Sequence, residues 1–218
     1  MLSSQETLET QIAFKAPFSC QLSGASQSGK TSLLINILKN REALIDKPPS
    51  RIVYCYSVFQ EAYRALESMN VEFVEGLPNL NEFYPEVDNM IILDDLMIEC
   101  EKNKDIQNLF TVHSHHKNIS VFIMTQNLFS KGPCARTISL NCRYLIVFNN
   151  PRDASQIRTL SQQMFPDRPA FLTQAYRDAI DSSAYGYIFL DNTQATPTKY
   201  RVQTNILPNE TRIFYRYK

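Results

Sequence analysis

Residues 24–31, with the sequence GASQSGKT, match the pattern GxxxxGK followed by Ser or Thr at every fixed position. A loop that cradles phosphates must turn its backbone N–H groups inward, which requires conformations that only glycine adopts cheaply. Lys30 would then reach the β- and γ-phosphates of a nucleotide, and the Thr31 hydroxyl would ligate Mg²⁺. The alternative is a surface turn that matches the pattern by chance. The predicted phosphate-binding residues are Gly24, Ala25, Ser26, Gln27, Ser28, Gly29, Lys30, Thr31 and Ser32.

Two aspartates follow a second apolar segment, IILDDL, at residues 91–96. A buried strand of a parallel sheet would place them at its carboxyl end, beside the phosphate loop. We expect Asp94 to hold Mg²⁺ through its water shell, and Asp95 to orient or deprotonate the water that attacks the γ-phosphate. The alternative is a pair of aspartates that caps a helix after a core strand.

A third apolar segment, FIMTQN at residues 122–127, ends in polar side chains. At the end of a buried strand, Gln126 would hydrogen-bond the γ-phosphate or the attacking water and report the state of the nucleotide to the following loop. The alternative is a polar strand end that begins a loop. Lys30, Asp95 and Gln126 are therefore the catalytic residues that the motifs predict.

These motifs need a sheet to position them, and the hydrophobic pattern predicts one. Continuous apolar runs at 89–96, 119–126 and 143–150 are typical of parallel strands covered on both faces. Further strands are expected at 17–23, 51–57 and 71–76, and helices at 30–45, 59–69, 98–114, 153–164 and 170–181. Alternating polar and apolar residues predict antiparallel or edge strands at 185–192, 198–204 and 212–217. The fold class is α/β, with a mostly parallel sheet, helices on both faces and right-handed crossovers.

The composition fits a single domain. The chain has 218 residues, of which 44% are hydrophobic and 20% are charged, enough apolar material for one core. We expect one domain over 1–218, with 1–14 as an N-terminal arm or an extra strand and 185–218 as C-terminal edge strands. No apolar run approaches the ~20 residues that span a bilayer, and the N-terminus lacks the features of a signal peptide. The five cysteines form no CxxC pair, which predicts free, mostly buried thiols in a soluble intracellular protein.

The charges are unevenly distributed although the net charge is zero. Residues 61–105 hold twelve acidic and three basic side chains, a net charge of −9. The rest of the chain must carry the balancing positive charge, so a neutral total is compatible with a basic face.

The order of the three motifs, followed by a segment with several arginines, resembles the FtsK/HerA superfamily of DNA-translocating ATPases. The closer resemblance is to the DNA-packaging ATPases of double-stranded DNA viruses and of Polinton-type elements, including adintoviruses. The phosphate loop and the acidic strand are common to P-loop enzymes, whereas the TQNLF and NPRD segments are the specific part. The resemblance covers about residues 15–207, and its segments are SHHKNISVFIMTQNLF (114–129), RTISLNCRYLIVFNNPRDASQI (136–157) and YGYIFLD (185–191).

This resemblance implies a P-loop NTPase of the RecA-like type that uses ATP and Mg²⁺. Such subunits form a homo-oligomeric ring, a hexamer or a pentamer, that translocates double-stranded DNA into a preformed capsid. Proteins of the capsid or of its portal vertex would be partners, and no membrane is implied. The protein would act in the cytoplasm or the nucleus of the host cell during virion assembly, or in association with the virion.

The resemblance also implies an arginine supplied in trans to the γ-phosphate of the neighbouring subunit. A guanidinium suits this role because it is permanently charged and presents a fork of donors. Arg152, just past a predicted core strand, is our first choice and Arg136 the second. The candidates after the third motif are Arg136, Arg143, Arg152 and Arg158.

Other functions remain as alternatives. A P-loop kinase would need an arginine-rich lid and would leave Gln126 without a task, and a GTPase would need an NKxD-type motif that the sequence lacks. A helicase-like replication or repair ATPase shares all three motifs. The absence of an appended primase, nuclease or winged-helix region in 218 residues favours the packaging motor, and a net charge of zero fits DNA contacts confined to a pore.

Overall fold

In residues 12–130 and 132–217, which the computed structural model describes, nine strands form one sheet in the order β3-β2-β4-β5-β1-β6-β7-β8-β9. The first six strands of this order run parallel to their neighbours, and β7, β8 and β9 are antiparallel. The strands are β1 (Ser19–Ser23), β2 (Arg51–Tyr56), β3 (Val71–Glu75), β4 (Asn89–Asp94), β5 (Ile119–Thr125), β6 (Tyr144–Phe148), β7 (Tyr187–Asp191), β8 (Val202–Thr204) and β9 (Ile213–Tyr215). The predicted α/β fold with a mostly parallel sheet is confirmed.

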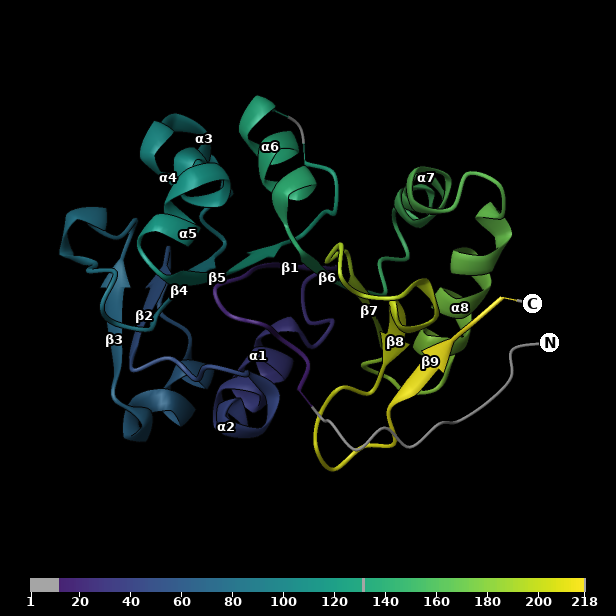
Figure 1. The fold of residues 1–218 in the computed structure, drawn as a ribbon, viewed down its shortest axis with the longest axis horizontal. Helices are drawn as coiled ribbons and strands as arrows, with labels where there is room; N and C mark the ends of the chain where they lie inside the picture. Colours follow the sequence, from purple (N-terminus) through teal and green to yellow (C-terminus); the bar gives the residue numbers. More distant parts are fainter. Residues whose placement is uncertain (1–11, 131, 218) are drawn as a thin grey trace.

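Helices cover both faces of the sheet (Figure 1). Successive side chains of a strand point to opposite faces, so Ile92 of β4 packs in the core beneath α1, and Ile91 packs in the core beneath α3 to α8. The α-helices are α1 (Lys30–Lys39), α2 (Arg41–Leu44), α3 (Met97–Lys102), α4 (Lys104–Asn108), α5 (Ser114–His116), α6 (Pro133–Asn141), α7 (Ser155–Met164) and α8 (Pro169–Asp181). The other helical segments are η1 (Glu61–Met69), η2 (Leu80–Glu82) and η4 (Thr198–Tyr200), all 3₁₀ helices, and η3 (Leu109–His113), a π-helix.

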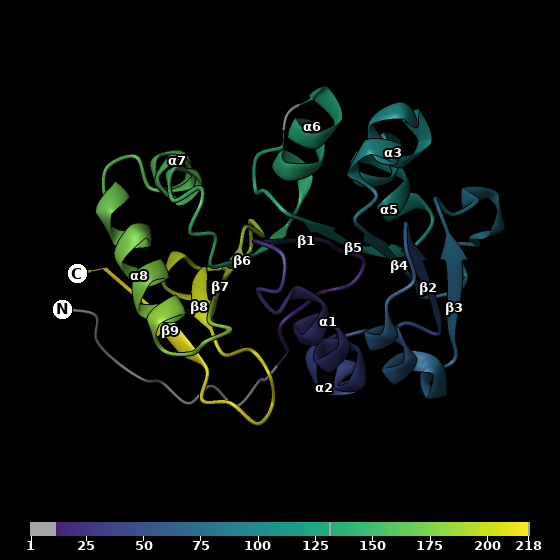
Figure 2. The same ribbon diagram turned by 180° about the vertical axis from the view of Figure 1, so that it is seen from behind.

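The C-terminal strands extend the sheet rather than forming a separate layer. β7 pairs with β6 on one side and β8 on the other, so that β9 and β3 lie at the two ends of the sheet (Figures 1 and 2). The prediction of antiparallel strands is therefore correct, but of the three only β9 is an edge strand. Because β7 runs against β6, its first residues lie at the edge of the sheet where the parallel strands end.

The prediction of one long helix at 98–114 is wrong. The structure breaks it at Asn103, whose backbone is extended (φ −117°, ψ 110°) and whose side chain accepts hydrogen bonds from the amides of Asp105 and Ile106. An asparagine side chain that caps the next helix competes with continuation of the preceding one. The helix expected at 30–45 is likewise divided at Asn40, between α1 and α2.

Two other helical predictions need correction. The amphipathic segment expected at 59–69 is a 3₁₀ helix that begins at Glu61, with Tyr63 and Leu66 buried. Helix α6 has no counterpart in the sequence prediction. It starts with Pro133 directly after Gly132, whose φ of 118° favours glycine.

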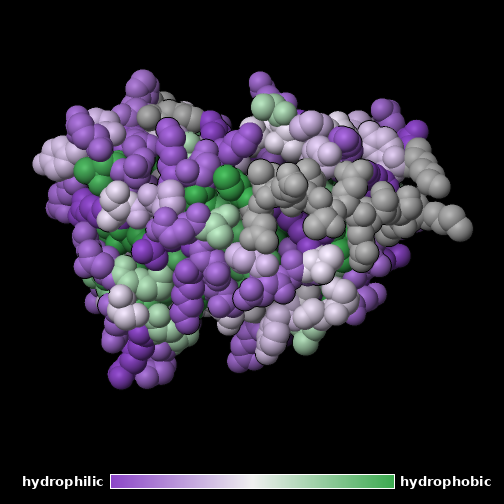
Figure 3. Space-filling view, turned by 60° about the horizontal axis from the view of Figure 1, so that its bottom comes forward, coloured by the Kyte–Doolittle hydropathy of each residue, from purple (hydrophilic) through white to green (hydrophobic). Residues whose placement is uncertain are grey.

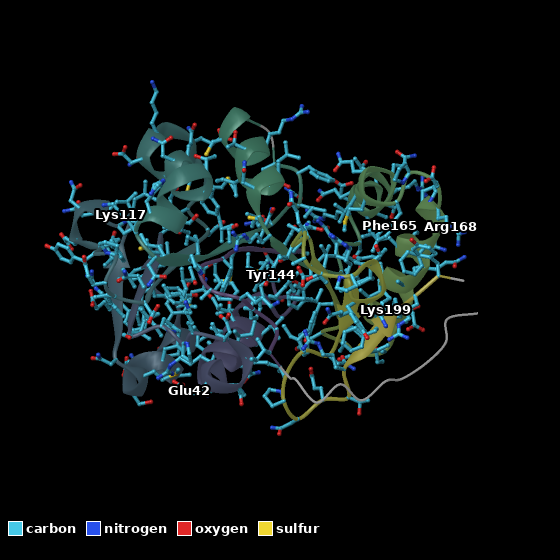
Figure 4. The ribbon with its side chains drawn as sticks, viewed as in Figure 1. Glu42, Lys117, Tyr144, Phe165, Arg168 and Lys199 are labelled. Atoms are coloured by element: carbon cyan, nitrogen blue, oxygen red, sulfur yellow. The ribbon has the colours of Figure 1, made fainter. Side chains whose placement is uncertain are left out.

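Residues 1–11 of the predicted N-terminal arm lie outside the described residues. Next to them, Phe14 makes an isolated parallel bridge with Ile45 and is fully buried. Its ring packs against the ring of Tyr144, at 5.2 Å between centroids, in the middle of the molecule (Figure 4). The segment before β1 thus belongs to the core under α1 and α2.

The polarity of the surface and the state of the cysteines are in line with the amino-acid composition. The face in Figure 3 is mostly hydrophilic, with small separate hydrophobic areas. All five cysteines are buried and free, as predicted. None of the helices in residues 12–130 and 132–217 combines the length and the apolar composition that a membrane span requires.

Candidate functional site

The predicted phosphate loop connects the end of β1 to the start of α1. A methyl carbon placed on Gly24 would lie 2.6 Å from Cβ of Phe148 in β6, so the loop fits against β6 only with glycine there. Gly29 has a φ of 102° and is the N-cap of α1. Gln27 also has a positive φ, of 63°, which is uncommon for a residue with a side chain. The loop is therefore tightly turned, as its two glycines predict.

The loop leaves groups available to an anion. Helix α1 has no side-chain N-cap and no acidic residue in its first turn, so no capping side chain occupies the end of the helix where an anion would bind. The buried Ser28 hydroxyl has no hydrogen-bond partner in the part of the chain that the structure describes. Lys30 Nζ donates to the carbonyls of Gly24 and Ala25, at 2.7 and 2.8 Å. Such a loop, with a cation folded over it, fits a phosphate chain.

The strand order places the acidic strand near this loop. β5 lies between β4 and β1, and the Gly24 N–H donates to the carbonyl of Thr125 at the end of β5, at 3.2 Å. In the pairing of β4 with β5, Asp94 lies opposite Met124. Because strand side chains alternate, Asp94 is on the same face of the sheet as Ile92, the face that α1 covers. Asp94 and Lys30 therefore meet at one edge of the sheet.

Two tyrosines that the sequence analysis missed hold the Asp94 carboxylate. The hydroxyls of Tyr54 in β2 and Tyr63 in η1 both donate to Oδ2 of Asp94, at 2.9 and 2.5 Å. Burial raises the pKa of both tyrosines, which keeps them protonated as donors. Both hydrogen bonds are made to Oδ2, so Oδ1 of the carboxylate is not involved in them.

Burial also changes the acidity of the two charged groups. It raises the pKa of Asp94, although the hydrogen bonds from Tyr63 and Tyr54 and the charge of Lys30 act in the opposite direction. Burial lowers the pKa of Lys30, and the carboxylates of Asp94 and Asp95 oppose this change. Each group would therefore keep its charge more easily with an oppositely charged partner in the cavity.

Three further predicted residues, Thr31, Asp95 and Gln126, line one cavity with this pair. Its volume is about 240 Å³ and its walls include Lys30, Thr31, Asp94, Asp95 and Gln126. Asp95 is exposed and has a φ of 56°, a left-handed conformation that aspartate and asparagine tolerate better than most residues. This turn directs the chain away from β4 immediately after Asp94. The three sequence motifs are thus brought together, and the loop residues Ser26 and Gln27 also line this cavity.

A hydrogen-bond network anchors the loop that follows Gln126. From β1, Gln21 Nε2 donates to Thr125 Oγ1 and to the carbonyl of Leu128, at 3.0 and 3.1 Å. The Leu128 N–H donates to Gln156 Oε1 at 2.6 Å, and Gln156 Nε2 donates to Asp153 at 2.6 Å. The segment with Gln126 and the segment with Arg152 are therefore connected through side chains to which the sequence analysis assigned no role.

The four candidate arginines occupy different environments. Arg152 is exposed in the turn after β6, and Arg136 is exposed in α6 and lines another cavity with Phe129 and Gln163. Neither is among the residues that line the phosphate-loop cavity. Arg143 is half-buried and its Nη1 donates to the carbonyl of Pro17 at 3.0 Å. Arg158 is exposed on α7.

The donors present fit Mg²⁺ bound together with a nucleotide. Mg²⁺ usually keeps several waters and takes one or two protein oxygens plus phosphate oxygens. Thr31 in the first turn of α1 and Asp94 opposite it would supply hydroxyl and carboxylate oxygen at the same cavity. Among the described residues, no group of three or more His, Cys, Asp or Glu side chains forms a separate metal site.

Comparison with known proteins gives a structural relationship without a sequence one. No protein-family model and no curated protein matches the chain. The genome packaging NTPase B204 of Sulfolobus turreted icosahedral virus 2, in complex with sulfate, is similar with a TM-score of 0.55 and 12% identity, over 92% of this chain and 96% of that one. The same enzyme in complex with ATP-gammaS has a TM-score of 0.50 and 12% identity, over 92% and 97%. The chain therefore shares the fold of a P-loop NTPase, over nearly the whole length of both proteins.

Proposed function

We propose that this chain is a Mg²⁺-dependent ATPase that acts as a ring-shaped oligomer and translocates double-stranded DNA into a preformed viral capsid. The observation that carries the proposal is the single cavity in which Lys30, Thr31, Asp94, Asp95 and Gln126 converge from three separate elements of the sequence. The genome packaging NTPase that shares the fold over nearly its whole length supports the packaging role.

The residues of the cavity would have different roles in phosphoryl transfer. Backbone N–H groups of the loop and the Lys30 ammonium would hold the β- and γ-phosphates. Mg²⁺, when bound, would neutralise charge on the phosphate oxygens, and Thr31 and Asp94 are the residues that would hold it. Tyr54 and Tyr63 would fix the orientation of the Asp94 carboxylate through their bonds to Oδ2. The substrate would therefore be positioned before any proton moves.

Asp95 and Gln126 would act on the attacking water. Asp95 would accept the proton of the water, and the Gln126 amide would orient that water or the γ-phosphate. The chain of hydrogen bonds from the Gln126 loop through Gln156 to the segment of Arg152 gives a route by which hydrolysis would alter the contact with the next subunit. An exposed Arg152 outside its own cavity is suited to reach the cavity of a neighbour.

The Asp95→Asn variant tests the hydrolytic half of the proposal. Asparagine adopts the left-handed conformation of this position as readily as aspartate, so the turn is preserved while the base is lost. We expect ATP turnover to fall by about 10²-fold or more, the usual contribution of a general base, with ATP affinity within about twofold of the wild type. Turnover is measured by phosphate release and affinity by calorimetric titration.

Asp167→Asn is the matched control, because Asp167 is also exposed and lies in the loop between α7 and α8, outside this cavity. It should leave turnover unchanged. A wild-type rate in Asp95→Asn, or weak ATP binding with normal residual chemistry, would make Asp95 a structural residue. The DNA dependence of hydrolysis by the wild-type chain tests the translocation half.

A further inference from the structure

Tyr185 is an exposed aromatic residue that lies directly against the phosphate loop. Its side chain is 64% exposed, yet a methyl carbon placed on Gly29 would lie 3.1 Å from its Cδ1 and 3.2 Å from its Cβ. The ring therefore covers the side of Gly29 where the loop turns into α1. Most of the residue remains open to solvent beside the phosphate loop.

The backbone around Tyr185 is bonded to the turn that follows helix α8 and packs closely against the helix. The N–H of Tyr185 donates to Ser183 Oγ at 3.3 Å, and the N–H of Gly186 donates to the Ser183 carbonyl at 3.0 Å. A methyl carbon on Gly186 would lie 2.3 Å from the carbonyl oxygen of Ala179, so only glycine allows this close approach to α8. The backbone of Tyr185 is thus anchored, although the residue is exposed.

The sheet also places Tyr185 on a defined side of the loop. Tyr187 at the start of β7 pairs with Phe148 at the end of β6, and Cβ of Phe148 lies against Gly24. β6 and β7 follow β1 on one side of the sheet, whereas β5 and β4 follow it on the other. The phosphate loop is therefore flanked by Tyr185 on one side and by Asp94, Asp95 and Gln126 on the opposite side.

A nucleoside triphosphate bound in this loop has a defined orientation of its phosphates and its base. If its terminal phosphate faces Asp95 and Gln126, as in the proposed function on which this inference rests, its base extends away from β4 and β5. That direction leads toward β6 and β7, where the open face of Tyr185 lies. A flat apolar ring with an exposed face is suited to stacking against a nucleobase.

We infer that Tyr185 is the base-stacking residue of the nucleotide site and that the site therefore prefers purine over pyrimidine nucleotides. Stacking on an aromatic ring accepts every base, but a purine offers the larger π-face. A stacking surface reads no pattern of donors and acceptors, so ATP and GTP should bind to Tyr185 alike. The ring would leave the phosphate contacts untouched, because those belong to the loop and Lys30.

The test distinguishes the contribution of the base to binding from the contribution of the phosphates. Binding of ATP, CTP and inorganic tripolyphosphate is measured by calorimetric titration with Mg²⁺ for the wild type, Tyr185→Phe and Tyr185→Ala. We expect Tyr185→Ala to weaken ATP binding about tenfold, the usual loss when a stacking side chain is removed, and to reduce the preference for ATP over CTP. Tripolyphosphate binding should be unchanged, and Tyr185→Phe should bind all three ligands as the wild type does.

Tyr84→Ala is the matched control, because Tyr84 is equally exposed, at 64%, and lies in the loop before β4. It should leave all three affinities unchanged. Equal ATP affinity in Tyr185→Ala and the wild type overturns the inference while the ATPase proposal stands. A parallel loss of tripolyphosphate binding also overturns it, because Tyr185 would then support the loop rather than the base. A wild-type chain that binds none of the three ligands contradicts the proposed function itself.

If the exposed ring instead served as a contact between subunits, Tyr185→Ala would change the mass of the ATP-bound assembly and leave the ATP affinity of the separated subunits intact. That result overturns the inference as well. Sedimentation of each variant at the concentrations used for titration distinguishes the two outcomes.

Discussion

Replacement of Lys30 by alanine is expected to lower ATP turnover by about 10³-fold and to weaken ATP binding. The Lys30 ammonium lies over the loop, with Nζ 2.7 Å from the carbonyl oxygen of Gly24 and 2.8 Å from that of Ala25. These carbonyls hold the ammonium where the phosphates would enter. Alanine would leave the negative charge of the γ-phosphate without this cation as the transition state forms. Phosphate release at saturating ATP measures the first effect, and calorimetric titration the second.

Lys39→Ala is the control for this change, since Lys39 is an exposed lysine in the last turn of the same helix. It should hydrolyse ATP at the wild-type rate. Thermal unfolding of Lys30→Ala establishes that the variant is folded, so that a lost rate reports on chemistry. Unchanged hydrolysis in a folded Lys30→Ala variant is incompatible with a phosphate site at residues 24–31.

The second large effect concerns the contact between subunits. Arg152→Ala should lower turnover by ~10³–10⁵-fold, the usual contribution of an arginine supplied to the transition state. The residue is exposed and does not line its own cavity, so the loss would arise at the cavity of a neighbour. Exposed ion pairs contribute far less than this amount. The size of the effect therefore separates a trans-acting arginine from a surface charge.

Mixing the two inactive variants shows whether the arginine acts in trans. An Arg152→Ala subunit keeps an intact phosphate loop, and a Lys30→Ala subunit keeps Arg152. At interfaces between the two, one complete site forms, so part of the activity should return. Phosphate release is followed as the ratio of the two variants is varied at constant total protein.

Arg177→Ala is the matched control, because Arg177 is an exposed arginine on α8 and is not one of the candidate trans arginines. It should retain wild-type turnover. If the Arg152→Ala and Lys30→Ala subunits assemble but recover no activity, Arg152 is not the trans residue. The same mixing experiment would then be made with Arg136→Ala.

The sequence predicted the parts of the site that depend on local spacing. The glycines of residues 24–31 are required by the turn itself, and the apolar runs before Asp94 and Gln126 are required by burial on both faces of the sheet. Parallel strands end at a common edge, so the convergence of these motifs followed from the order of elements. The structure brings these residues to one cavity, and their catalytic roles remain predictions.

Features that depend on contacts between distant segments could not be predicted. Tyr54 and Tyr63 read as ordinary buried aromatics, and only the pairing of β2 with β4 and the position of η1 bring their hydroxyls to Asp94. Gln21 appears as an isolated polar residue in an apolar strand, although its side chain anchors the loop after β5. A buried polar side chain needs partners, and this is the one signal that could have drawn attention to Gln21.

The prediction of helix boundaries fails where side chains compete for the hydrogen bonds of the backbone. The apolar spacing of residues 98–114 is helical, but the hydrogen bonds from the amides of Asp105 and Ile106 to Asn103 end one helix and begin the next. Helix α6 carries mixed polarity and a proline at its first position, so its periodicity gave no clear signal. Tyr185 lay at the start of a predicted strand, and its contact with Gly29 arises from the antiparallel pairing of β7 with β6.

ATP hydrolysis by the wild-type chain, measured with Mg²⁺ over a range of protein concentrations with and without double-stranded DNA, tests the central claim most directly. The mass of the ATP-bound assembly is determined at the same concentrations. The account predicts slow hydrolysis by a dilute monomer, a steep rise as the assembly forms, and a further increase when double-stranded DNA is added. Full activity in a dilute monomer, or the same rate with and without DNA at every concentration, would contradict a ring-shaped DNA-translocating ATPase.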